Sequence, residues 1–230
     1  ATTIKPGWRG VQRNLWTYST WKLMGHEFTK GEVSITNSVL VDISSADIWS
    51  NNTVINGNKF IGDRSINFRG DNLSYVNNKH DAKELNNTRS SVGWLWNYGN
   101  NGQYSNNTFI DGNGAIAIAG SADNYTLKNN DFYNLSSNVI YLSSTSNISM
   151  SYNYFKDINT AVWQYNTTDV LFHNNEFING TAGYGTYFSG TNVNLYKNNF
   201  SHCADYCILL TSLGSSGSEN IYIHNNSFDN

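Results

Sequence analysis

The sequence has little proline, little cysteine and few charges. Pro6 is the single proline among 230 residues, and because proline cannot donate to a β-ladder, its absence elsewhere leaves the chain free to form uninterrupted strands. Charged residues make up 13% with a net charge of −3, which excludes the basic surface that nucleic-acid binding requires. No apolar run reaches the roughly 18 residues of a membrane-spanning helix, so we expect no membrane span.

The polarity of the chain comes from asparagine instead. There are 38 asparagines, and aromatic residues reach 14%. That aromatic content is too high for a disordered chain, so the asparagine richness indicates an ordered structure.

The two cysteines, Cys203 and Cys207, lie in the segment His202-Cys203-Ala204-Asp205-Tyr206-Cys207. In a secreted protein a local disulfide that closes a bulged turn is expected. The alternative is a metal site formed by both thiolates with His202 and Asp205. A second cysteine pair would support a metal site, and the sequence has none. We therefore predict a Cys203–Cys207 disulfide, no metal and no other cofactor.

Two features favour an extracellular or cell-surface location. The chain begins Ala1-Thr2-Thr3, as it would after removal of a signal peptide, although a trimmed chain would begin in the same way. It also contains eleven Asn-x-Ser/Thr sequons. These glycosylation candidates are Asn51, Asn72, Asn86, Asn106, Asn124, Asn134, Asn147, Asn166, Asn179, Asn199 and Asn225. A sequence rich in Asn, Ser and Thr also produces sequons by chance.

An internal repeat, Asn-Asn-x-Phe, recurs along the chain. The copies begin at Asn106, Asn129, Asn174 and Asn225, with looser ones at Asn153 and Asn198 and weaker ones at Asn51 and Asn77. From Phe109 to Phe200 the phenylalanines of successive copies recur at a nearly constant interval. This regularity predicts a solenoid.

In the residues before each copy, apolar and polar side chains alternate with a period of two, as they do in a β-strand. Two apolar columns flank a mostly polar one, and the residue that leads each strand is Asn or Asp. These leading residues are Asn72, Asn124, Asn147, Asp169, Asn192 and Asn220. Asparagine tolerates the left-handed backbone of a tight turn, and its amide can bond the same group one coil away. We expect a structural ladder at this corner.

A second strand in each coil is predicted from a further set of mostly apolar segments, 115–118, 139–142, 161–164, 185–188 and 207–210. The short segment that contains the repeated phenylalanine supplies a third side. Each coil is therefore one repeat long and contains two or three short strands. This organisation predicts an all-β, right-handed parallel β-helix, a solenoid of about eight coils over residues 33–230.

The repeated Asn-Asn-x-Phe with its preceding alternating strand resembles the parallel β-helix repeats of the pectate-lyase-like superfamily, especially the NosD-type repeats. The resemblance covers about residues 33–230 and implies the fold more than the function, because such repeats occur in lyases, hydrolases, adhesins and envelope proteins. Asn-rich versions with sequons also resemble surface-layer and sheath proteins of methanogenic archaea.

The two ends differ from the repeat. Residues 1–32 contain one asparagine and many aromatic and basic residues, which predicts an N-terminal cap over the first coil or, alternatively, a segment that docks onto another subunit. The repeat continues to Asn230 without a polar cap. We expect another molecule to cover this last coil, or the chain to be a fragment. A second copy of the chain would give head-to-tail assembly.

Residues suited to catalysis are scattered. The closest candidates are Asp63, Arg64, Arg69, Asp71, Lys79, His80, Asp81, Lys83 and Glu84. An irregular insertion at 78–102 adds Trp94, Trp96 and Tyr98, which could contact a sugar on a loop. We favour the alternative, a solvated loop with a hydrophobic patch against the solenoid, because no pair of the charged residues has a defined catalytic spacing. The column Asp111, Asn134, Asp157, Asn179, His202 and Asn230 suits either weak calcium binding or a second turn ladder.

The sequence therefore leads to two function hypotheses. The first is a secreted structural subunit of a cell-envelope sheath, surface layer or filament that binds copies of itself and is not an enzyme. The alternative is a carbohydrate-active or carbohydrate-binding β-helix with its site on the 78–102 loop and cell-surface glycans as ligands. A viral tail-fibre module is a third possibility.

Overall fold

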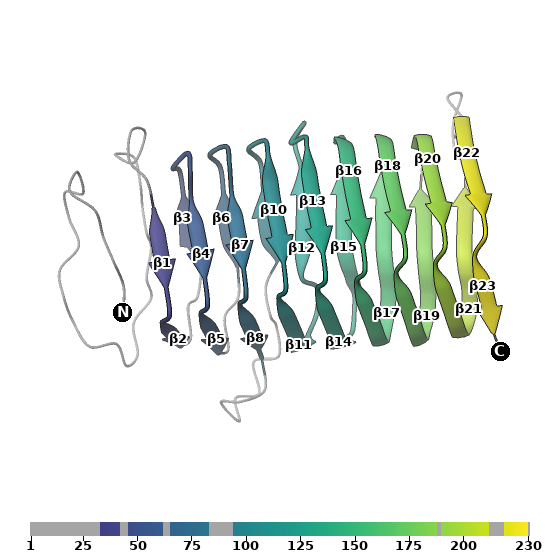
Figure 1. The fold of residues 1–230 in the computed structure, drawn as a ribbon, viewed down its shortest axis with the longest axis horizontal. Coiled ribbons are helices and arrows are strands. Elements are labelled where there is room, and N and C mark those ends of the chain that lie inside the picture. Colours follow the sequence, from purple (N-terminus) through teal and green to yellow (C-terminus); the bar gives the residue numbers. More distant parts are fainter. Residues whose placement is uncertain are drawn as a thin grey trace.

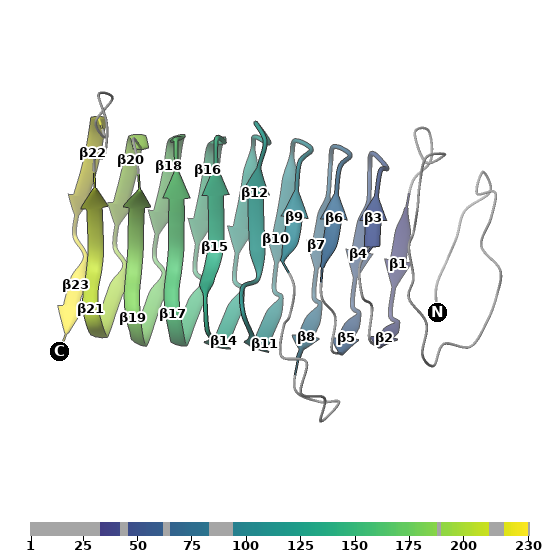
Figure 2. The same ribbon diagram turned by 180° about the vertical axis from the view of Figure 1, so that it is seen from behind.

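The computed structural model describes residues 33–41, 46–61, 65–82, 94–187, 190–211 and 219–229. Every regular element in these ranges is a β-strand, and all strand pairs are parallel. The strands form a solenoid of coils stacked along the long axis of the molecule (Figure 1, and from behind in Figure 2). The predicted all-β fold is confirmed. The described part contains no helix with the length and apolarity that a membrane crossing needs. The expected N-terminal cap at 1–32 lies outside the described residues.

One face of the solenoid is a sheet of nine parallel strands, one from each coil. In spatial order they are β1 (Ser34–Thr36), β4 (Val54–Asn56), β7 (Ser74–Val76), β10 (Gly102–Ser105), β13 (Tyr125–Lys128), β16 (Ser146–Ser151), β18 (Thr167–His173), β20 (Gly190–Tyr196) and β22 (Glu219–His224). The count is therefore nine rungs rather than about eight. At about 4.8 Å a step, the eight intervals between them extend about 38 Å.

The remaining strands form a fourteen-stranded sheet with two limbs. The first limb holds β2 (Val39–Val41), β5 (Lys59–Ile61), β8 (Lys79–Asp81), β11 (Thr108–Gly112) and β14 (Asp131–Leu135). The second limb holds β3 (Ala46–Ile48), β6 (Ile66–Phe68), β9 (Leu95–Asn97), β12 (Ile116–Ala119) and β15 (Asn138–Ser143). Later coils merge both limbs into β17 (Tyr154–Tyr165), β19 (Glu176–Tyr187) and β21 (Asn199–Thr211), and β23 (Ser227–Asp229) follows. Early coils thus have three sides, as predicted.

A stack of equivalent aromatic side chains, one from each coil after the first, runs through the core and ends at the exposed Phe228. The column consists of Phe60, His80, Phe109, Phe132, Phe155, Phe177, Phe200 and Phe228. Adjacent rings such as Phe109 and Phe132 lie 5.2 Å apart and nearly parallel, a favourable geometry when the rings are offset. His80 replaces phenylalanine in this column and is fully buried, and its Nε2 is hydrogen-bonded to the Tyr75 hydroxyl.

A buried asparagine ladder runs beside the aromatic column. Its members are Asn58, Asn78, Asn107, Asn130, Asn153, Asn175, Asn198 and Asn226. Within it, Asn153 Oδ1 accepts the backbone N–H of Asn130 at 3.0 Å, and Asn153 Nδ2 donates to the carbonyl of Leu127 at 2.9 Å. The side chains thus satisfy backbone groups that a buried turn would otherwise leave unpaired.

The corner ladder expected from the leading Asn and Asp column is confirmed. All six predicted residues have φ between 55° and 64°, the left-handed region that asparagine tolerates. Asn124 Nδ2 donates to Asn101 Oδ1 at 3.1 Å, and Asn220 Nδ2 donates to Asn192 Oδ1 at 3.1 Å. The corner is therefore held by side-chain amides from neighbouring coils.

Two predicted alignments are wrong. The segment 51–54 is not a copy of Asn-Asn-x-Phe, because Phe60 pairs with His80 and the equivalent copy is Asn58-Lys59-Phe60. The residue equivalent to Ala161 in the next coil is Gly183 rather than Gly185, because Val162 pairs with Tyr184. The first error arises because that coil is shorter than the regular period, and the second because the extra length of the β19 to β21 step was placed one coil too early.

Candidate functional site

The outer surface of the second limb carries large aromatic side chains in the first coils. Strands β3, β6 and β9 point Ile48, Phe68 and Leu95 inward, so the alternating residues face outward. Trp49, Arg69 and Tyr98 follow the ends of these strands in three successive coils. Trp49 and Tyr98 are among the exposed large side chains of the protein.

Arg69 lies between two rings. Its guanidinium carbon is 4.8 Å from the centroid of the Trp49 ring and 4.8 Å from that of Tyr98. Each such cation–π contact is worth about 0.5–1 kcal/mol at an exposed site. The stack holds a long side chain in one orientation although it is 36% exposed.

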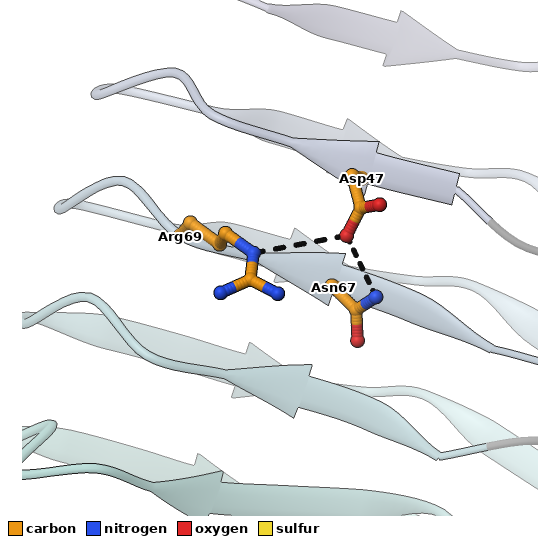
Figure 3. Close-up of polar contacts among 3 residues, drawn as sticks. All are labelled: Asp47, Asn67 and Arg69. Carbon is orange, nitrogen blue, oxygen red and sulfur yellow. Dashed lines mark hydrogen bonds and ion pairs between the residues drawn. The ribbon is translucent and has the colours of Figure 1, made fainter. Parts of the chain in front are cut away.

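A polar group flanks this stack. Asp47 Oδ1 accepts a hydrogen bond from Asn67 Nδ2 at 2.7 Å and lies 3.7 Å from Arg69 Nε. Figure 3 shows the two terminal guanidinium nitrogens of Arg69 pointing away from Asp47. A planar donor edge of this kind can pair with two oxygens at once.

Three further rings continue the surface, two on the coil of Tyr98 and one on a later coil. Trp94 and Trp96 flank Leu95 in β9, and Tyr141 comes from β15, with centroid separations of 6.0 to 6.4 Å. Ala117, in register between Trp96 and Tyr141, is fully buried although it faces outward. A Cβ on Gly114 would come within 2.7 Å of the Trp94 ring. Small residues in this coil therefore let the rings lie flat against the solenoid.

Trp96 also connects the two groups, because its ring stacks on Tyr98 with an interplanar angle of 9°. We call the continuous surface the aromatic face. It consists of Trp49, Arg69, Trp94, Trp96, Tyr98 and Tyr141, with Asp47 and Asn67 at one end.

The predicted aromatics Trp94, Trp96 and Tyr98 are thus brought together, but not on a loop at 78–102 as expected. Lys79–Asp81 form β8, and Leu95–Asn97 form β9; residues 83–93 lie outside the described part. Sequence reasoning missed Trp49, Asn67 and Tyr141 as members of the same face.

The candidate catalytic residues are not brought together. His80 is buried in the core, whereas Arg69 belongs to the aromatic face. Lys79 and Asp81 form an ion pair at 3.2 Å, and Asp71 Oδ1 accepts the N–H of Asn100 at a turn. Asp63, Arg64, Lys83 and Glu84 lie outside the described residues.

The residues of the two alternative metal sites, the cysteine segment and the column suited to calcium, have structural roles instead. Cys203 and Cys207 are joined in a disulfide, which takes both thiolates from the alternative site with His202 and Asp205. In the calcium column, Asn134 Nδ2 donates to Asp111 Oδ1 and Asn179 Nδ2 to Asp157 Oδ1, so these pairs form a turn ladder. No group of three or more metal-ligating side chains occurs among the described residues.

A second row of exposed rings follows the end of the nine-stranded sheet. His173, Tyr196 and His224 stack at 4.8 and 5.3 Å, with Tyr152 edge-on to His173. Burial and the nearby Lys197 lower the pKa of His173. Its Nδ1 is bonded to Asn174 Nδ2 at 2.8 Å, so this row is a self-contained surface stripe.

Comparison with known proteins identifies the fold. The family model described as a right handed beta helix region matches residues 92–230, more than half of the chain. The chain belongs to the right-handed β-helix family. No curated protein and no solved structure matched this β-helix.

Chemically, the aromatic face of the β-helix offers flat apolar rings next to planar polar groups. A sugar ring presents C–H groups on its two faces and hydroxyls around its rim. The C–H faces stack on aromatic rings, and rim hydroxyls pair with carboxylate, amide and guanidinium groups. The face therefore has both kinds of contact that a carbohydrate needs.

Proposed function

We propose that this protein is an extracellular β-helix that binds carbohydrate along its aromatic face. The observation that carries the proposal is the fixed Arg69 guanidinium between Trp49 and Tyr98, beside the Trp94, Trp96 and Tyr141 rings. Exposed apolar patches rimmed by polar groups mark ligand surfaces in proteins. The Cys203–Cys207 disulfide and the sequons support an extracellular location.

The layout favours a chain-like ligand over a single sugar. The face extends over successive coils, from Asp47 in β3 to Tyr141 in β15, which is four steps of the solenoid. At about 4.8 Å a step this is about 19 Å, enough for several linked sugar rings laid along the solenoid axis.

The test is binding of the full chain to arrayed oligosaccharides, followed by calorimetric titration of the best ligand. Trp96→Ala is expected to weaken binding about tenfold or more, because the loss of one stacked ring and its buried area is worth about 1.4 kcal/mol or more. Trp49→Ala gives a second variant at a more exposed ring. Tyr152→Ala, an exposed ring off the face, is the matched control and keeps full affinity. Absence of any oligosaccharide ligand, or equal losses in the control, would overturn the proposal.

A structural role in the cell envelope is the second candidate function. It is favoured by the uninterrupted ladders, which make a stiff rod, and by the scarcity of charge. In this proposal copies of the chain associate with one another. Electron microscopy of natively purified protein tests it: ordered tubes, sheets or filaments support assembly, and dispersed single particles count against it.

A further inference from the structure

The sequon asparagines are candidate attachment sites for N-linked glycans. Ten of the eleven sequon asparagines belong to the described residues, with Asn86 outside them, and all ten are exposed. Exposure therefore does not distinguish one from another. An N-linked glycan attaches to the side-chain Nδ2, so what distinguishes them is whether that atom already has a structural role.

Most sequon asparagines use Nδ2 to hold a turn. Six of them donate it to a side chain in a neighbouring coil, and all six have a left-handed backbone. These ladder sequons are Asn72, Asn106, Asn124, Asn134, Asn147 and Asn179. Asn225 also has a left-handed backbone and bonds His224 through Nδ2, and Asn166 shares that backbone conformation.

Asn51 and Asn199 differ from this group. Neither has a left-handed backbone. Asn51 accepts the N–H of Asp71 through Oδ1, which leaves Nδ2 uninvolved. Asn199 opens β21 on the outer surface, in register between Glu176 and Ser227, and its side chain makes no hydrogen bond with the described residues.

A glycan has different consequences at the two kinds of position. It removes one of the two Nδ2 hydrogens and places a sugar ring next to coils about 4.8 Å apart. At a ladder sequon this opposes the amide contact between coils and the left-handed turn that depends on it. At Asn51 and Asn199 no contact is lost.

We propose that Asn51 and Asn199 are the N-glycosylation sites of the folded protein, and that the ladder sequons remain unmodified. This inference rests on the extracellular location in the proposed function, not on sugar binding by the aromatic face. The hydroxyls of Thr53 and Ser201, which complete the two sequons, are buried and donate to the carbonyls of Ser50 and Phe177. Transfer of the glycan therefore precedes closure of the coil, and folding then selects among modified chains.

Of the two proposed sites, Asn51 lies two residues after Trp49 of the aromatic face, and Asn199 lies on β21. None of the ten described sequon asparagines lies on β3, β6, β9, β12 or β15, the strands that carry this face. A glycan on Asn199 extends instead from the outer side of the first limb.

The test is to secrete the full chain from a host with N-glycosylation and to map glycopeptides in the folded, secreted fraction by mass spectrometry. We expect most molecules to carry sugar at Asn51 and Asn199 and few at the ladder sequons. Asn51→Gln with Asn199→Gln should remove nearly all attached sugar, whereas Asn147→Gln should remove almost none. Native protein with occupied ladder sequons, or with both proposed sites empty while a control glycoprotein is modified, would overturn the inference.

A second measurement uses unglycosylated protein. Asn147→Gln is expected to lower the melting temperature by a few degrees, because it removes a ladder amide, and Asn199→Gln is expected to leave it unchanged. An unchanged melting temperature in Asn147→Gln would remove the basis for protection of the ladder sites. Oligosaccharide binding by the same unglycosylated protein is measured separately, so failure of one proposal leaves the other intact.

Discussion

At the scale of single residues, the fold depends on asparagine side chains that are buried rather than exposed. At a turn between two strands of a coil, each of these side chains provides the hydrogen-bond partner that a backbone group would otherwise lack. Removing a buried partner costs more than the hydrogen bond itself contributes, because the remaining group keeps its full desolvation penalty. The buried asparagine ladder is therefore the position where small substitutions have the largest effect.

Asn153→Ala is predicted to lower the free energy of unfolding by about 2–6 kcal/mol. The substitution leaves the Asn130 N–H and the Leu127 carbonyl buried without partners, at about 1–3 kcal/mol for each group. Urea unfolding followed by circular dichroism measures it. Asn159→Ala, at an exposed position of the following strand β17, is the matched control and should change stability by less than about 0.5 kcal/mol. Equal effects of the two substitutions would contradict the role of the ladder.

The lowered pKa of His173 predicts that the folded protein loses stability in mild acid. Burial and Lys197 lower the pKa of His173 in the folded protein, so the unfolded chain binds the proton more readily. Its contribution is present above the unfolded pKa of about 6.5 and is lost as the pH falls through the folded pKa. Protonation of Nδ1 also ends the hydrogen bond from Asn174.

Melting temperatures between pH 7 and pH 5 check this prediction. His173→Gln should reduce the fall in melting temperature over that range, and His224→Gln serves as the control for removing a ring from the same stripe. An identical pH dependence in wild type and His173→Gln would show that this histidine has no part in it.

The sequence predicted the corner ladder but not the buried one. Asn72 and its equivalents lead each strand, and the left-handed preference of asparagine identifies a turn. The second residue of each Asn-Asn pair is as polar as the first, and its pattern gives no sign that it faces the core. Its burial becomes visible only when the carbonyl that it bonds, on a different coil, is known.

At the scale of strands, the disulfide is associated with an irregularity. Gly180 pairs with Cys203 and Ala182 with Tyr206, so β21 has one more residue than β19 over this stretch. Cys203 and Cys207 bracket the extra residue and pack partly against the core. The predicted bulge and the predicted cysteine pair thus lie at one place, where a β-bulge interrupts the ladder.

Replacement of both cysteines by serine is predicted to lower the free energy of unfolding by about 2 kcal/mol. The figure follows from the short loop that the bridge closes in the unfolded chain. Urea unfolding of the double variant, with reduced wild-type protein as the control, measures it. Faster hydrogen exchange should be confined to β19, β21 and β23, and a loss spread evenly over all coils would contradict this location.

The aromatic face illustrates where sequence reasoning fails at this scale. Trp49, Arg69 and Tyr98 are neighbours because of the register of β3, β6 and β9. The coils that join these strands differ in length from one another, whereas the later coils repeat almost regularly. A strict period therefore does not align the three residues. Trp94, Trp96 and Tyr98 were recognised because they lie close together in the sequence, a signal that needs no register between coils.

At the scale of the whole molecule, stability is divided among coils that contact only their neighbours. In such a repeat architecture the end coils open more readily than the central ones. We predict that amides of β13, β16 and β18 exchange with solvent much more slowly than those of β4 and β22. Hydrogen–deuterium exchange with mass spectrometry measures this gradient, and uniform protection along the chain would contradict it.

The buried asparagine ladder also has a direction. In every step the N–H of the earlier coil donates to the Oδ1 of the later one, from Asn58 and Asn78 to Asn198 and Asn226. A duplicated coil inserted in phase would continue this chain of bonds, and a deleted coil would let its two neighbours join. The length of the rod can therefore change during evolution by whole coils. Because the aromatic face occupies particular early coils, such changes can lengthen the later part of the rod without altering this face.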